Sequence, residues 1–202
     1  MKNTIKNTKK GILMVTMFAT LLSFANDGSL FNITNDAKRT YLTLESVKQG
    51  NLLSVKDING IILYKEYIQK TGTYTKGFDL TALPDGEYVF ELDKDLEINT
   101  IPFKVDSNVV VFNKENEKTI YKPVVRVKNG LVYVTKLNLN ETPLKISIYF
   151  QNESGSELMY KEIITETTSK TISKIFKLEG LKKGSYKMIF NSEGRQFVEY
   201  IN

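Results

Sequence analysis

Apolar and polar residues alternate with a period of two in several segments that follow an apolar N-terminal stretch. In the segment 86–93, Tyr88, Phe90 and Leu92 fall on one face, and the positions between them are mostly acidic. The segment 185–190 repeats this alternation, which is typical of a half-buried β-strand. No segment of the remaining chain keeps apolar residues at helical spacing over three turns, so we expect little or no α-helix there.

Turn signals separate the apolar runs. The dipeptides Asn59-Gly60, Asn129-Gly130 and Ser154-Gly155 lie between such runs, and Asn-Gly favours the tight two-residue hairpin turn with positive φ at both positions. Short strands with turn signals every 8–12 residues indicate a β-sandwich.

The chain contains an internal repeat with a period close to 100 residues. A set of leucine, glycine and tyrosine positions recurs 98 residues later: Leu80, Leu83, Gly86 and Tyr88 correspond to Leu178, Leu181, Gly184 and Tyr186. A Tyr-Lys-Glu triplet also recurs, from Tyr64 to Tyr160, at a slightly different spacing. A period of this length indicates duplication of a whole domain and not a solenoid.

We interpret the repeated positions as packing residues. The leucines are expected to close one end of a sandwich, and Gly86 and Gly184 to permit a tight backbone there. The tyrosine hydroxyl is expected to bond backbone, as in a tyrosine corner. The alternative reading makes Tyr88 and Tyr186 residues that stack on a ligand.

The repeat divides the chain into a leader over 1–25, a first domain over 26–106 and a second domain over 107–202. The polar run 113–118 is interpreted as a solvated turn of the second domain. The predicted linker near residues 106–108 lacks glycine and serine enrichment, so the domains are expected to be stiffly coupled.

The leader has the composition of a signal peptide. Four lysines precede an apolar run of about 15 residues, and Ser23-Phe24-Ala25 is a small-x-small cleavage site before Asn26. The run is shorter than the roughly 20 residues that a spanning helix needs. An uncleaved anchor and a buried helix are the alternatives. We expect an exported protein, periplasmic, cell-surface or extracellular, with no membrane span after cleavage.

Composition removes several kinds of chemistry. The four leader lysines account for most of the net charge of +5, and without them 24 basic residues face 23 acidic ones. A mature chain so close to neutral is not expected to bind nucleic acid. The chain has no cysteine and no histidine, which excludes disulfides, thiolate catalysis, the Ser-His-Asp triad and metal sites built on either residue.

No catalytic, cofactor-binding or metal-binding motif stands out, so we expect neither an enzyme nor a bound cofactor. The carboxylates of 93–97 offer oxygen ligands for calcium, but the segment lacks the glycine and distal glutamate of an EF-hand loop. A solvated hairpin tip is the preferred interpretation. A small carbohydrate-binding protein is an alternative, for which Tyr67, Tyr74 and Tyr133 are the candidate platform.

The second half of the chain resembles a known family. The segments 146–150 and 196–201 are apolar strands, and Gly155 and the motif Leu-x-x-Gly-x-Tyr of 181–186 lie between them. This order is similar to that of the immunoglobulin-like modules of secreted Bacteroidetes proteins, especially the C-terminal sorting domain of the type IX secretion system. The resemblance implies an all-β fold of two tandem immunoglobulin-like β-sandwich domains after an N-terminal signal-peptide helix.

The expected function is a non-enzymatic interaction or structural role, with a protein or cell-surface partner. The resemblance implies an alternative, in which the C-terminal domain is a secretion-sorting or surface-attachment module. Exposed sheet edges are the expected binding surface, because an edge strand can accept a strand from a partner.

Overall fold

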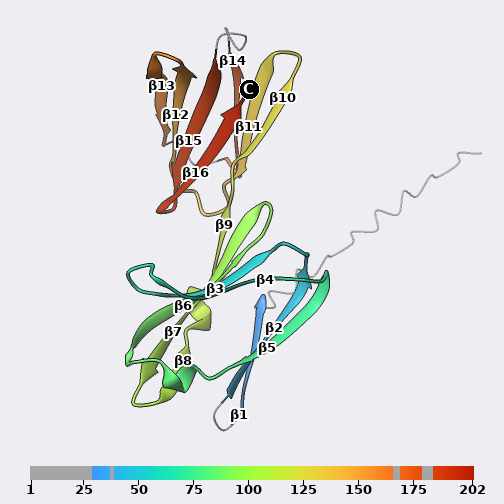
Figure 1. The fold of residues 1–202 in the computed structure, drawn as a ribbon, viewed down its shortest axis with the longest axis vertical. Helices are drawn as coiled ribbons and strands as arrows, with labels where there is room; N and C mark the ends of the chain where they lie inside the picture. Colours follow the sequence, from blue (N-terminus) through green and yellow to red (C-terminus); the bar gives the residue numbers. More distant parts are fainter. Residues whose placement is uncertain (1–28, 37–38, 166–168, 179–183) are drawn as a thin grey trace, which may run out of the picture.

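The computed structural model describes residues 29–36, 39–165, 169–178 and 184–202. These residues form antiparallel sheets and two short 3-10 helices, η1 (Leu80–Ala82) and η2 (Lys114–Asn116), with no α-helix. The all-β prediction is therefore confirmed for this part of the chain. Figure 1 shows two lobes, one above the other, with β9 running between them. The predicted leader and its cleavage site between Ala25 and Asn26 lie outside the described residues.

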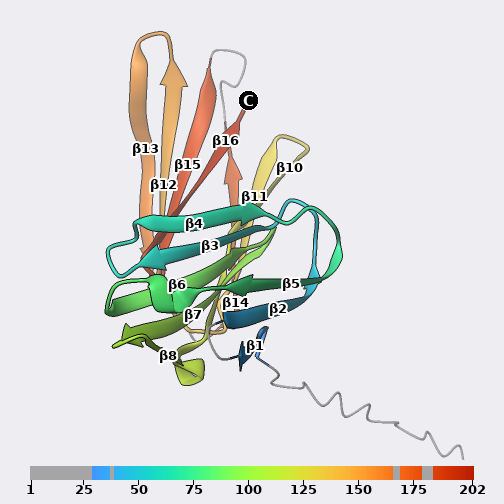
Figure 2. The ribbon, with the colours of Figure 1, turned by 60° about the horizontal axis from the view of Figure 1, so that its bottom comes forward.

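The first lobe is a sandwich of two sheets. The smaller sheet has the order β1-β2-β5, with β1 Phe31–Asp36, β2 Arg39–Val47 and β5 Gly72–Phe78. The larger sheet has the order β4-β3-β6-β7-β8, and β9 also pairs with β7 (Figure 2). Its strands are β3 Leu52–Asp57, β4 Ile62–Tyr67, β6 Gly86–Asp93, β7 Glu97–Asp106, β8 Val109–Phe112 and β9 Lys118–Tyr121.

The second lobe repeats this arrangement. Its smaller sheet has the order β10-β11-β14, with β10 Val124–Lys128, β11 Leu131–Leu137 and β14 Thr171–Lys177. Its larger sheet has the order β13-β12-β15-β16, with β12 Leu144–Asn152, β13 Gly155–Ile164, β15 Ser185–Ser192 and β16 Arg195–Ile201. Strands β10–β16 thus occupy, one by one, the sheet positions of β1–β7.

Each sandwich has its own core between its two sheets. In the first, Phe31 and Leu42 of the smaller sheet meet Phe90 and Ile101 of the larger one, and all four are fully buried. In the second, residues of β11 and β14 meet residues of β12, β15 and β16. Separate cores are what a duplicated domain predicts, because each copy buries its own apolar faces.

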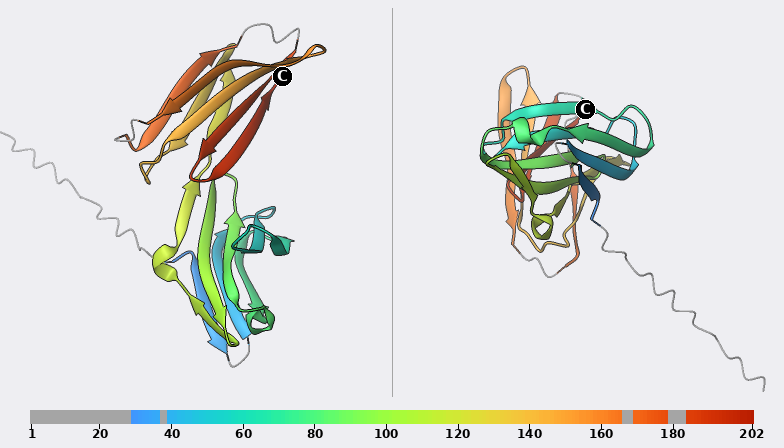
Figure 3. Two further views of the ribbon diagram at one scale, coloured as in Figure 1. Left: turned by 90° about the vertical axis from the view of Figure 1, so that its left-hand side faces the viewer. Right: turned by 90° about the horizontal axis from the view of Figure 1, so that it is seen from below.

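The boundary between the domains differs from the prediction. Residues 106–108, the predicted linker, are a tight hairpin turn, since Ser107 and Asn108 both have positive φ (51° and 64°). The turn returns the chain along β7 as β8, and β9 then pairs with the start of the same strand. Residues 107–121 therefore belong to the first sandwich, and the chain passes to the second at Lys122-Pro123 (Figure 3, left).

The Asn-Gly turns have different geometries. Asn129 and Gly130 both have positive φ and join β10 to β11 as predicted. Between β3 and β4 only Gly60 has positive φ, and Asp57 accepts hydrogen bonds from the backbone N–H groups of Asn59 and Ile61. The side chain of Asp57 therefore sets a longer loop there than the predicted two-residue turn.

Candidate functional site

The repeated leucine and tyrosine positions lie against the cores. Tyr88 is buried, and its hydroxyl donates to the Pro84 carbonyl at 2.7 Å, the bond expected of a tyrosine corner. Leu80 is buried, and Leu83 packs against the same core. In the second sandwich Leu178 and Tyr186 pack in the same way. Leu181 lies outside the described residues.

The two repeated glycines have different environments. Neither has a positive φ. A Cβ on Gly86 would lie 3.5 Å from the Tyr88 hydroxyl, which is an ordinary contact, whereas a Cβ on Gly184 would lie 2.3 Å from the Gln151 carbonyl oxygen. Close approach of β12 therefore requires glycine at 184, while nothing in the geometry requires it at 86.

The Tyr-Lys-Glu triplet of the first sandwich connects its two sheets. On β4, the Tyr64 hydroxyl donates to the Glu66 carboxylate, and Lys76 reaches the same carboxylate from β5 of the other sheet. Tyr74 donates to it at 3.1 Å. The Tyr64 ring meets Phe78 edge-on, with centroids 5.3 Å apart. We call Tyr64, Glu66 and Lys76 the first latch.

The second sandwich has an equivalent latch, formed by Tyr160, Glu162 and Lys174. The Tyr160 hydroxyl donates to Glu162 on β13 at 2.6 Å, and Lys174 donates from β14 at 2.8 Å. Phe176 meets the Tyr160 ring, again at 5.3 Å. Lys76 and Lys174 are 98 residues apart, as are the repeated leucines. The sequence pattern alone did not indicate these two lysines. The triplet thus recurs because it holds each sandwich closed.

The latches stabilise charged forms. The hydrogen bond from Lys76, followed by that from Tyr64, lowers the pKa of Glu66, and Lys174 and Tyr160 lower the pKa of Glu162 in the same order. Burial and then Glu66 raise the pKa of Tyr74. A carboxylate held charged and a tyrosine held protonated are poor acid–base catalysts near neutrality, so the latch chemistry is structural.

We expect the latches to make stability acid-sensitive. Because the folded pKa of Glu66 and Glu162 lies below the ordinary value of 4.5, their contribution is fully present above that pH and is lost as pH falls through the folded pKa. The double variant E66Q/E162Q should therefore lose less free energy of unfolding than the native chain between about pH 7 and about pH 3, measured by urea titration. E87Q is the control, and an unchanged pH dependence in the double variant would contradict the assignment.

The two sandwiches meet through buried charge. Glu91 lies on the face of β6 that points away from the first core, yet it is only 4% exposed. Arg195, which opens β16 in the second sandwich, donates to one of its carboxylate oxygens, and Lys56 donates to the other at 2.6 Å. In the sequence, Glu91 is one of the acidic positions that alternate with the apolar residues of 86–93, and in the structure the second sandwich covers it.

A second polar chain crosses the same junction. The Lys136 side chain is fully buried, and its Nζ donates to Glu193 at 3.1 Å in the turn between β15 and β16. Asn140 donates to the other oxygen of Glu193 at 2.8 Å and also to the Thr119 carbonyl on β9 at 3.0 Å. The turn that holds the buried lysine is thereby linked to the first sandwich.

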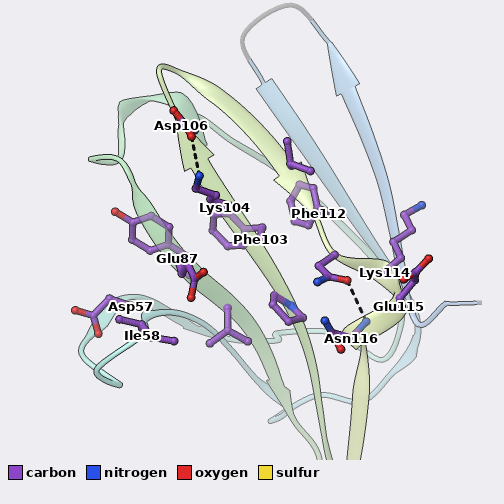
Figure 4. Close-up of a pocket in the computed structure, with 15 residues that line it drawn as sticks. Asp57, Ile58, Glu87, Phe103, Lys104, Asp106, Phe112, Lys114, Glu115 and Asn116 are labelled. Atoms are coloured by element: carbon purple, nitrogen blue, oxygen red, sulfur yellow. Dashed lines mark hydrogen bonds and ion pairs between the residues drawn. The ribbon is translucent and has the colours of Figure 1, made fainter.

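A hollow lies on the outer face of the first sandwich, with a volume of about 990 Å³. Figure 4 shows it between the β3–β4 turn, at Ile58, and η2. The outer faces of β6, β7 and β8 contribute Val89, Pro102 and Val111 to its lining. We call this hollow the outer-face trough. Its apolar floor departs from the polar outer face that a solvated sheet normally presents.

The polar groups around the trough do not converge on one point. Asp57 is occupied by the backbone of its own turn, and Lys104 is paired with Asp106 at 2.7 Å, which raises the pKa of Lys104. Glu87 makes no hydrogen bond or ion pair with any described residue. Among the residues that line the trough, no nucleophile stands beside a base.

The acidic segment 93–97 has no calcium cradle. Lys122 binds Asp93, Lys48 binds Asp95 at 3.2 Å, and the remaining acid, Glu97, is paired with Lys94 at 2.9 Å. Across the described ranges, no three acidic side chains are grouped as a metal ion would require. The carboxylates of this turn act as partners for lysines, and Lys122 in particular fixes the passage to the second sandwich.

Both edge strands β4 and β13 carry a bulge directly before the Tyr-Lys-Glu triplet. The pairing of β3 with β4 skips Leu63, and that of β12 with β13 skips Met159. These two side chains are 47% and 54% exposed, and each follows another exposed apolar residue, Ile62 or Leu158. We call the two pairs the bulge pairs. Sequence alternation could not reveal them, because a bulge breaks the period of two.

The proposed tyrosine platform is not assembled on one surface. Tyr67 lies on β4 and is exposed, Tyr74 lies on β5 and packs against the first core, and Tyr133 lies on β11 of the second sandwich. These strands belong to three different sheets.

In the residues that the structure covers, no helix has the length and apolar character to cross a membrane. Comparison of the sequence with family models gives no match, and a search of curated proteins gives none either.

Proposed function

We propose that the chain is an exported, non-enzymatic interaction protein whose two sandwiches each present a binding surface. The bulge pairs are the observation that carries this proposal. Ile62-Leu63 and Leu158-Met159 remain apolar and exposed in both copies of the duplicated domain, although burial in the core does not require it. Exposed apolar side chains at equivalent places are expected of surfaces that contact a partner.

The distribution of polar groups supports a non-enzymatic role. The latches and the junction engage the carboxylates of Glu66, Glu162, Glu91 and Glu193 with lysine or arginine. The chain has no histidine or cysteine, and the trough offers no activated nucleophile. Binding by surface contact needs none of these groups.

Export is proposed from the leader, whose lysines, apolar run and small-x-small site have the order of a signal peptide. The mature chain is then periplasmic, cell-surface or extracellular. The dispersed positions of Tyr67, Tyr74 and Tyr133 give no support to carbohydrate binding.

A photo-crosslinking experiment tests the proposal. A benzophenone amino acid at Leu63 or Met159 should give the same adduct in producing cells, recovered from the envelope or medium on chains that begin at Asn26. Ile175, which is 63% exposed on the smaller sheet of the second sandwich, is the matched control and should give none. Adducts of equal yield at all three positions, no adduct at either bulge, or recovery only from cytoplasm with the leader intact would reject the proposal.

A further inference from the structure

The duplication allows the edges of the two sandwiches to be compared. In the described part of the chain, β1 and β10, β4 and β13, and β5 and β14 end their sheets in both copies. The equivalent strands β7 and β16 are treated differently. The first copy continues its larger sheet beyond β7, whereas the second ends its larger sheet at β16.

The outer edge of β7 is occupied along its length. β9 pairs with residues 97–100 and β8 with residues 103–106, and between them the Asn113 N–H donates to the Pro102 carbonyl at 2.9 Å. Val110 and Phe112 of β8 pack against the first core. The first sandwich therefore supplies its own covering strands, and the alternate side chains of β8 extend its core.

The same edge of β16 has no covering strand among the described residues. β16 lies with β15 along one side of the second sandwich (Figure 3, left). Its seven residues, 195–201, continue without a bulge in their pairing with β15. A regular edge of this kind is a template for another strand, whereas the bulges of β4 and β13 interrupt their edges.

We propose that the outer edge of β16 receives an extended strand of a partner protein, in which alternate residues are apolar and one of them is replaced by a basic residue that faces Glu199. This inference rests on the proposed interaction function and names the edge and the chemistry that it recognises. Main-chain hydrogen bonds give such a complex its affinity, and side chains at alternate positions give its specificity.

Glu199 carries the chemical part of the argument. Its partner on β15 is Met188, just as Ile101 on β7 pairs with Phe90. Ile101 is fully buried, but Glu199 takes the equivalent place as an exposed carboxylate on the core side of the strand. Among the described residues it forms no ion pair. A strand laid on this edge meets that charge, and opposite charges on neighbouring strands stabilise a sheet.

The segment that covers β7 in the first copy is the template for the other positions of the partner strand. Val110 and Phe112 direct apolar side chains toward the first core from β8. Phe197 and Ile201 present the corresponding apolar surface of the second core beside the open edge. A partner strand that alternates β-branched and polar residues, with a lysine or arginine among the inward ones, therefore matches both the shape and the charge.

Two nine-residue peptides test this inference on the mature chain. Both alternate valine with threonine, and the central valine is replaced by lysine in one and by glutamate in the other. Backbone hydrogen exchange should slow in β16 with the lysine peptide and stay unchanged in β7, whose edge is covered. The glutamate peptide should bind at least about fivefold more weakly, and E199K should reverse this preference. An unchanged thermal unfolding temperature shows that E199K is folded.

Each contrary result has a distinct meaning. If neither peptide protects β16, or if E199K leaves the preference unchanged, the inference is wrong. Protection of β16 that rises with protein concentration without peptide would identify a second copy of this chain as the occupant, which also overturns it. Crosslinks at Leu63 and Met159 do not involve β16, so their presence beside a negative peptide result rejects the edge alone.

Discussion

Gly184→Ala is expected to destabilise the second sandwich by about 2–3 kcal/mol, because an added methyl group in a tightly packed place forces the backbone to move. Its Cβ would lie 2.3 Å from the Gln151 carbonyl oxygen and 2.7 Å from the Phe150 ring. One of these atoms is backbone in the middle sheet strand β12, which cannot shift without disturbing its pairs with β13 and β15. Urea unfolding measures the change as a lower midpoint at constant slope.

Gly86→Ala is the matched control for this prediction. The two glycines hold the same place in the repeat, 98 residues apart, but a Cβ on Gly86 would meet nothing closer than 3.5 Å. We expect its free energy of unfolding to stay within about 0.5 kcal/mol of the native value. Equal losses in the two variants would show that the repeated glycine serves the backbone turn itself and not the approach of β12.

The alternation of apolar residues predicted the strands well, because burial on one face enforces it. Tyr88, Phe90 and Leu92 lie in the first core as the period of two indicated. The repeat also predicted that the arrangement of strands around it is duplicated. Since the leucines and tyrosines recur in order, the same seven-strand arrangement recurs with them. The Tyr88 hydroxyl bond to Pro84 also follows from the spacing of the motif.

The domain boundary was predicted wrongly for a local reason. Ser107-Asn108 was interpreted as a linker because it is polar and lies between apolar runs. Only the positive φ of both residues reveals a hairpin, and serine gives a weaker turn signal than the glycine of Asn-Gly. Among the described residues, the covering strands β8 and β9 have no counterpart in the second copy, so the repeat could not indicate where they belong.

The contacts of the candidate surfaces depend on residues far apart in the chain. Glu91 and Arg195 are separated by 104 positions, and no pattern within one strand shows that a turn of the second sandwich will cover the first. Leu63 and Met159 are similar cases. Their exposure results from bulges that appear only when the pairing partner is known. Local pattern therefore predicts the scaffold, while the surfaces that it presents depend on tertiary contacts.

Glu193→Gln is expected to lower the free energy of unfolding by about 3 kcal/mol, because removal of one partner leaves a buried charge without compensation. The side chain of Lys136 is fully buried and that of Glu193 is 11% exposed. Glutamine keeps the size of the side chain and its bond to Asn140. Alanine would also remove the oxygen that accepts the hydrogen bond from Asn140. Chemical denaturation with intrinsic tyrosine fluorescence measures the loss.

The double variant K136M/E193Q separates charge from packing. Methionine fills the volume of the lysine stem without a charge, so the uncompensated ion of the single variant is gone, and stability should return to within about 1 kcal/mol of the native chain. If the double variant stays as unstable as E193Q, the uncompensated charge of Lys136 is not the cause of the loss, and the prediction is wrong. Asn140→Ala is the control, because it breaks the link to Thr119 while leaving the Lys136–Glu193 pair in place.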